Sequence, residues 1–362
     1  MTTHEARRPA TRRRPATRRR GALMLLVRVA LAAGLLAVVF VRVDFGRLRD
    51  AFARIEPWQL VAAYALYVVS LMFKAARWKL IGVTHRHATV LDCFSATANG
   101  FLVGLLLPAP GMFEFTRAYV MKKRARVPLG SVLGVIAAER ALDTVLLLAA
   151  SGCILVVLSP PARWLSVMTL VLAAGVAVGL LLLVVLVATR QRSVPWLERA
   201  LSRLSPRLGT RVAGGVGHFA DALHQLGVLR AGGVLGALGC SVGLWGARAG
   251  YVLLVVRSLG IECAVALAIL VAAVEYLGML VVFTPAGIGQ YQVLVVAVLA
   301  AFGFDKTLAT SASLVLHAVR LFVVVSLGVP FLAHEHLRVA KLRAERAKTE
   351  GETGSLGPGA AE

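Results

Sequence analysis

The feature that most constrains this chain is a series of long apolar runs between residues 22 and 333. A helix that crosses a membrane needs about 20 apolar residues to span a hydrocarbon core of about 30 Å. The composition agrees, because 58% of the residues are hydrophobic and 16% are charged, whereas soluble domains average about 25% charged residues. We therefore expect an all-α polytopic membrane protein, and an ordinary soluble enzyme is excluded. About six full spans are expected, at 22–41, 58–76, 128–158, 164–188, 232–256 and 307–333.

The apolar segment 89–116 is interrupted by Pro108 and Pro110. Basic residues flank it on both sides, at 74–86 and at 117–126, and such residues mark the cytoplasmic side of a membrane. Both ends therefore face the same way, and 28 residues are too few for two crossings. The pattern predicts a re-entrant helical hairpin that is broken at the prolines.

A second interrupted segment, 263–302, is broken at Pro285, Gly287 and Gly289. The last span must end in the cytoplasm, because basic residues follow it at 338–348. Segment 263–302 then starts and finishes outside, either as a hairpin that enters from the opposite face or as two short spans. Two oppositely oriented broken hairpins predict an inverted-repeat-like arrangement.

The chain carries 40 Lys and Arg against 18 Asp and Glu, a net charge of +22. Most basic residues fall in the predicted cytoplasmic segments, so the charge indicates an anionic inner leaflet rather than nucleic acid, for which no motif is present. We expect a multi-pass protein of the inner cell membrane with both termini in the cytoplasm. The expected parts are a disordered arginine-rich arm (1–21), a transmembrane domain (22–333) with an amphipathic cytoplasmic loop (189–231), and a charged helix with a disordered tail (334–362).

The sequence contains no GxxxxGK[ST] phosphate loop, no GxGxxG motif after a strand, and no HExxH motif. Its four cysteines lie singly within apolar stretches, without metal-ligand spacing. We therefore expect no cofactor, no bound metal and no catalytic residue.

Polar residues at the first break are candidates for a site that contacts a lipid headgroup. Non-helical backbone at membrane depth survives only where protein or a wet cavity covers it, and a helix that starts there presents its positive end to an anion. Glu114 and Arg117 should share a helix face after the break. The alternative is an interfacial salt bridge that simply ends the hairpin. The candidates here are Asn99, Pro108, Glu114 and Arg117.

Three further charges, Glu139, Arg140 and Asp143, lie within the apolar run 128–158. At 1.5 Å per residue, Glu139 falls about 16 Å into the helix, near the middle of the bilayer. A charge there costs about 2.5–3.5 kcal/mol, so we expect all three to face the bundle interior, with Arg140 partly neutralised by the two carboxylates. They form either a structural ion-pair cluster or part of a polar pathway.

The second break is followed by polar residues at 290–292, and single charges interrupt neighbouring apolar runs. We expect these residues to share one polar interior with the three charges above. The candidates in this group are Arg248, Glu275, Pro285, Gly287, Gly289, Gln292 and Arg320.

At these residues the chain resembles the flippase-like integral membrane family related to the transmembrane region of lysylphosphatidylglycerol synthase. The resembling features are Arg77-Trp78, the stretch 99–117, Glu139-Arg140 with Asp143, and the turn 285–289. The family pattern usually has Glu where this chain has Gln292, and Gly where it has Phe113. The resemblance implies the lipid-binding or lipid-translocating half without the synthase catalytic domain.

These observations favour an inner-membrane protein that binds an anionic lipid or lipid-linked precursor and translocates it between leaflets without ATP. A second hypothesis is a non-transporting anchor or regulatory subunit for an enzyme of envelope-lipid or glycan synthesis. A third is an intramembrane lipid-modifying enzyme that uses Glu114, Glu139 or Asp143 as an acid or base. The sequence leaves the lipid and the oligomeric state open.

Overall fold

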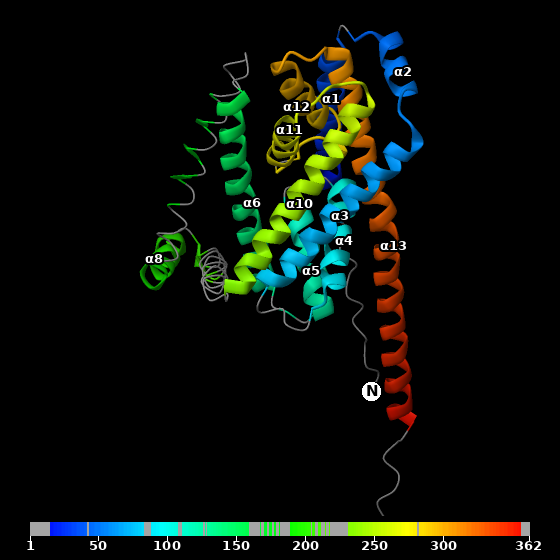
Figure 1. Ribbon diagram of the computed structural model, residues 1–362. Coiled ribbons are helices and arrows are strands. Elements are labelled where there is room, and N and C mark those ends of the chain that lie inside the picture. Colours follow the sequence, from blue (N-terminus) through cyan, green and yellow to red (C-terminus); the bar gives the residue numbers. More distant parts are fainter. Residues whose placement is uncertain are drawn as a thin grey trace, which may run out of the picture.

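A computed structural model describes residues 15–41, 43–82, 88–107, 111–125, 127, 129–158, 189–203, 231–280 and 282–355, with scattered positions elsewhere between 167 and 217. Within these residues the regular structure is helical, with no strand (Figure 1).

Five helices of the described chain are long and apolar enough to cross a membrane, which confirms the polytopic all-α class. The predicted span 164–188 lies largely outside the described residues. The first helix begins within the predicted arginine-rich arm, and the last continues from its apolar part into the charged tail as one helix. The five are α1 (Pro15–Phe40), α3 (Pro57–Ile81), α6 (Leu129–Leu158), α10 (Ala231–Ser258) and α13 (Lys306–Ser355).

Each broken segment is a pair of short helices. The first pair is α4 (Val90–Leu106) and α5 (Met112–Ala125), and the second is α11 (Val265–Gly278) and α12 (Gln290–Ala301). Helices α11 and α12 have 14 and 12 residues, or about 21 and 18 Å at 1.5 Å per residue, too short to cross about 30 Å of hydrocarbon. These lengths favour the re-entrant hairpin over the alternative of two short spans.

The two hairpins enter the bundle from opposite ends. In Figure 1, α4 starts near the end of the bundle where α3 finishes, whereas α11 starts near the end where α10 finishes. Each hairpin returns to the side from which it came, and the second turn lies inside the bundle, where Thr284 and Gly287 are buried. The structure therefore confirms the predicted opposed orientation.

The second turn has a left-handed backbone. It contains the 3-10 helix η2 (Pro285–Gly287), and φ is +56° at Ala286, +75° at Gly287 and +80° at Gly289. Glycine adopts this conformation without the clash that a Cβ atom causes. At Gly289 a Cβ would also lie 2.7 Å from the carbonyl oxygen of Ala32, so this turn packs closely against α1.

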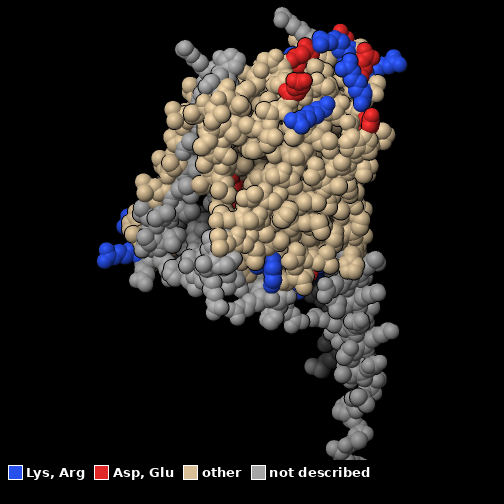
Figure 2. Space-filling view, viewed as in Figure 1, with Lys and Arg blue, Asp and Glu red and all other residues tan. Residues whose placement is uncertain are grey.

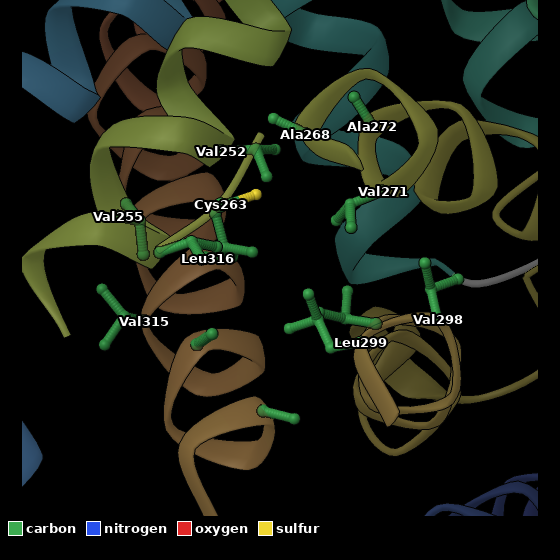
Figure 3. Close-up of a cluster of buried hydrophobic side chains, with 14 of the residues drawn as sticks. Val252, Val255, Cys263, Ala268, Val271, Ala272, Val298, Leu299, Val315 and Leu316 are labelled. Carbon is green, nitrogen blue, oxygen red and sulfur yellow. The ribbon is translucent and has the colours of Figure 1, made fainter. Parts of the chain in front are cut away.

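An apolar core fixes the second hairpin between α10 and α13. Figure 3 shows side chains of these four helices converging, among them Val255, Val271, Leu299 and Leu316. The hydroxyl of Tyr251 on α10 donates to the backbone carbonyl of Leu316 on α13. The described helix pair with the most extensive contact is α3 with α10.

The outer surface matches a lipid environment. Figure 2 shows a broad band of uncharged side chains, with Lys, Arg, Asp and Glu gathered at one end near α2 (Phe45–Ala53). Large apolar side chains of α1, such as Leu26, are more than half exposed. A soluble protein rarely exposes an apolar surface of this extent.

One helix stands apart from the bundle in Figure 1, α8 (Arg190–Ser202), whose Trp196 is exposed. It forms the start of the predicted amphipathic loop 189–231. Most of the rest of that loop, the first 14 residues of the chain and residues 356–362 lie outside the described residues. The position of the loop on a membrane surface stays a prediction.

Gly328 tests the contact between α13 and the first hairpin. An added Cβ would lie 2.6 Å from the Cβ of Leu102 on α4, so Gly328→Ala should separate the two helices and lower the melting temperature in detergent. Gly239→Ala on α10 is the matched control, because no atom lies within 4 Å of its added Cβ and alanine favours the helix. Equal melting temperatures for the two variants would contradict this packing.

Candidate functional site

Five buried charged side chains from three helices form the centre of the bundle. They are at most 5% exposed. Burial of an unpaired charge is strongly unfavourable, so buried charged side chains are found next to side chains of opposite charge. This charged cluster consists of Lys74 and Arg77 on α3, Arg117 on α5, and Glu139 and Asp143 on α6.

Asp143 is held by side chains from three other helices. Arg77 donates to it twice, from Nη1 to Oδ1 at 2.6 Å and from Nη2 to Oδ2 at 2.8 Å. Trp245 Nε1 on α10 and the Tyr276 hydroxyl on α11 also donate to it, at 3.3 and 3.2 Å. This carboxylate therefore ties α6 to α3, α10 and α11.

Glu139 accepts from all three cations of the cluster. Arg117 Nη2 lies 2.9 Å from Oε2, Arg77 Nη2 lies 3.3 Å from Oε1, and Lys74 Nζ also donates to Oε1. The guanidinium of Arg117 stacks on the Trp78 ring at 4.1 Å. Lys74 and Arg77 are three residues apart and the two carboxylates four apart, so each pair shares one helix face.

Arg140 has a partner that the sequence analysis did not predict. Its Nη2 lies 2.7 Å from Oε1 of Glu114 on α5, so its salt bridge is with Glu114 rather than with Glu139 or Asp143. Adjacent helical residues point about 100° apart, and Arg140 therefore cannot share the face of Glu139. Glu114 and Arg117 likewise pair with α6 rather than with each other.

A further ion pair lies between α10 and α11. Arg248 Nη1 lies 3.4 Å from Oε1 of Glu275, and Arg248 Nε donates to the Ser70 hydroxyl at 3.2 Å. The Arg248 guanidinium also lies over the ring of Tyr67, 4.1 Å from its centre. Arg320 on α13 lies over the ring of Tyr291 at 5.6 Å.

A cavity of about 130 Å³ lies between the two hairpins, and this volume is enough for several water molecules. The ion pairs Glu114–Arg140 and Arg248–Glu275 both line it. Residues 111–114 of the first hairpin and residues 279, 280, 282 and 286 of the second line it. Figure 2 shows acidic atoms deep in a narrow gap in the apolar band. Of the residues expected to share one polar interior, Arg140, Asp143, Arg248, Glu275 and Arg320 line this cavity, whereas Glu139, Gln292 and the Pro and Gly residues of the second turn are not among its lining residues. The charged side chains of its wall are Lys74, Glu114, Arg140, Asp143, Arg248, Glu275 and Arg320.

Hydrogen bonds fix the conformation of the second turn. The backbone N–H of Gly289 donates to Gln292 Oε1 at 2.7 Å, which leaves the Gln292 amide nitrogen to donate to His317 Nδ1 at 2.8 Å. His317 Nε2 then donates to the carbonyl of Ala286 at 3.2 Å. The directions of these bonds require a neutral imidazole with its proton on Nε2, and they hold Ala286 at its positive φ.

Outside the bundle centre, an ion pair closes the base of the first hairpin. Arg124 Nη1 near the end of α5 lies 2.9 Å from Asp92 Oδ1 at the start of α4. Partial burial acts against ionisation of Asp92, but hydrogen bonds from Thr89 and Arg124 outweigh it and lower the pKa of this carboxyl. Asp92 is therefore ionised and joins the ends of the two helices.

The remaining candidates divide into three groups. Pro285, Gly287 and Gly289 form the second turn, and Gln292 supports it. Asn99 is buried on α4, where it donates to Ser95, and it is not among the residues that line the cavity. Pro108 lies outside the described residues.

Sequence reasoning missed several residues of the site. The pattern of basic flanks assigns Lys74 and Arg77 to the cytoplasmic boundary, although their spacing of three residues inside an apolar run is a usable signal for a buried site. His317 was also missed, and its position three residues before Arg320 places both on one helix face. The aromatic residues Tyr67, Trp245 and Tyr276 gave no signal that separates them from ordinary core residues.

The fold and the cavity define a polytopic helical membrane protein with two opposed hairpins around a charged interior. Residues 25–328 match the family described as the lysylphosphatidylglycerol synthase TM region, so the chain belongs to this family. Comparisons with curated proteins and with solved structures found no match.

Removal of one buried partner should destabilise the bundle. Arg77→Gln leaves Asp143 without its two shortest bonds, and breaking a buried pair typically costs about 3–5 kcal/mol. The matched control, Arg47→Gln, removes an exposed pair with Asp305, which is worth at most about 1 kcal/mol. Denaturant titration in mixed micelles measures both free energies of unfolding. Similar losses for the two variants would show that the charged cluster is not needed for stability.

Proposed function

We propose that this protein binds the anionic headgroup of a lipid or lipid-linked precursor in the cavity and moves the lipid between the leaflets of a bacterial inner membrane. The observation that carries the proposal is the position of the cavity. It lies between hairpins that enter from opposite ends of the bundle, and its wall combines both hairpins with cationic side chains. Such a site near the midplane is reachable from either leaflet through a small rearrangement.

The charge balance supports an anionic ligand. In the described chain, the charged cluster and the cavity wall together contain six cationic side chains and four carboxylates. Charges interact strongly in a poorly solvated interior, so the excess of positive charge favours an anion in the cavity. Arginine binds phosphate oxygens through two parallel hydrogen bonds, which makes a phosphate-containing headgroup the preferred ligand.

The energy for movement would come from an ion gradient or from the lipid gradient, because the sequence contains no nucleotide-binding motif. We further propose that both termini face the cytoplasm, which is supported by the basic residues around the arm, the first hairpin and the tail. The role proposed here is transport rather than catalysis.

Proteoliposomes with a headgroup-labelled anionic lipid and dithionite quenching test this function. The wild type should move the lipid faster than empty vesicles do. Arg140→Ala should slow the movement about 10- to 100-fold, because a hydrogen bond to a charged group is worth about 1.5–3 kcal/mol. Arg47→Ala, on the exposed helix α2, should match the wild type. The proposal fails if the wild type equals empty vesicles or if Arg140→Ala equals the wild type.

A second candidate function is a non-transporting anchor or regulatory subunit for an enzyme of envelope-lipid or glycan synthesis. It is supported by the eight arginines of segment 1–21 and by α8, which stands apart from the bundle. Both features offer cationic docking surfaces for a partner.

The transporter and the regulatory subunit should respond differently to loss of the arginines in segment 1–21. Replacement of the eight arginines in segment 1–21 by glutamine should leave lipid movement in proteoliposomes unchanged if the protein is a transporter. A regulatory subunit would instead lose its effect in cells after this replacement and keep it after Glu139→Gln. Complementation of a deletion strain by the two variants, with matched expression levels, distinguishes these outcomes.

A further inference from the structure

Two salt bridges join the same pair of helices, α5 and α6, but differ in their access to solvent. Arg117 on α5 pairs with Glu139 on α6, and both side chains are fully buried. Glu114 on α5 pairs with Arg140 on α6, and these side chains are 27% and 23% exposed. The first bridge is sealed within the charged cluster, whereas the second lines the cavity.

This difference determines which bridge a ligand can exchange. No ligand can replace a buried partner without opening the bundle, and an uncompensated buried charge is strongly unfavourable. The bridge between Glu114 and Arg140 is only partly buried and lines the cavity, so an incoming anion can reach Arg140 without opening the bundle. A phosphate group can therefore take the place of the Glu114 carboxylate.

We propose that Glu114 is an internal competitor for the headgroup: its carboxylate occupies Arg140 in the empty site, and a phosphate-bearing headgroup displaces it. This inference rests on the proposed function and names the residue that sets the strength of headgroup binding. A headgroup that carries no anionic group cannot replace the carboxylate, so the competitor selects for phosphomonoester or phosphodiester groups.

The surroundings of Arg140 suit such an exchange. Its guanidinium lies over the ring of Phe113 and over the ring of Tyr276, 5.3 Å from each centre, and these aromatic contacts hold the cation in position when its anion changes. The sealed bridge between Arg117 and Glu139 meanwhile keeps α5 attached to α6. Displacement of Glu114 therefore breaks one bridge and leaves the helix pair intact.

Direct binding measurements on the full-length protein in maltoside micelles, whose headgroups carry no phosphate, test this inference. The probes are a short-chain phosphatidylglycerol, glycerol phosphate and inorganic phosphate, titrated separately. Glu114→Gln keeps the shape of the side chain and removes the competing charge, so it should lower the Kd of the phosphate-bearing lipid about 3- to 10-fold. Glu114→Asp should give an intermediate value, and Glu262→Gln, which removes an exposed acid elsewhere, should match the wild type.

If Glu114 competes with the headgroup, Glu114→Gln binds the lipid more tightly. If Glu114 only supports the structure of the site, the same substitution weakens lipid binding. The gain must also disappear when Arg140→Ala is combined with Glu114→Gln. Unchanged or weaker binding by Glu114→Gln, or an equal gain in Glu262→Gln, would overturn the inference and leave the proposed function standing, provided that Arg140→Ala still weakens binding. If the wild type and Arg140→Ala bind the lipid equally, the proposed function itself fails. An equal gain for inorganic phosphate would assign the site to free phosphate rather than to a lipid.

Discussion

Charge pairing inside an otherwise apolar bundle is the interaction on which the rest of the structure depends. A single charge at the centre of a bilayer costs about 2.5–3.5 kcal/mol, and the charged cluster contains five. Glu139 and Asp143 offset this cost only because α3 and α5 bring three cations within bonding distance. The same bonds fix the relative rotation of α3, α5 and α6, and through Trp245 and Tyr276 they also fix α10 and α11. The cavity exists because these helices are held around it.

The polar residues that follow the second break have a structural explanation of the same kind. Lipid cannot satisfy the N–H and C=O groups of a turn at membrane depth. Gln290 accepts from the backbone N–H of Phe283 at 3.3 Å and donates to the carbonyl of Gly278 at 2.7 Å, while Gln292 and His317 satisfy Gly289 and Ala286. The side chains thus complete the backbone bonding that the helix break removes. This chemistry needs no charge, which explains how a neutral Gln292 suits the position in this chain.

The spans and the two breaks could be predicted from the sequence because they depend on local properties, namely the length of an apolar run and the positions of Pro and Gly. The basic residues that flank each segment assign its two ends to one side of the membrane, and this assignment predicts that the two hairpins enter from opposite faces. The partners of the charged residues could not be predicted, because they depend on how each helix is rotated about its axis. Arg140 illustrates the limit: its sequence neighbours are carboxylates, yet it pairs with Glu114. Lys74 and Arg77 were interpreted as boundary charges because Lys79 and Arg86 follow them, whereas α3 extends to Ile81 and carries both into the interior.

The difference between the fully buried ion pairs and the ion pairs that line the cavity bears on the transport proposed above. A carrier that has no external energy input at the site must release a headgroup about as readily as it binds it. A site built only from free cations would hold an anion too tightly in a poorly solvated interior. Among the described residues, the four cavity cations are already balanced in part, Lys74 by Glu139, Arg140 by Glu114, Arg248 by Glu275, and Arg320 by the face of Tyr291. Binding of a headgroup would then exchange one set of interactions for another of similar strength. The buried cluster behind the wall would keep the helices in place while that exchange occurs.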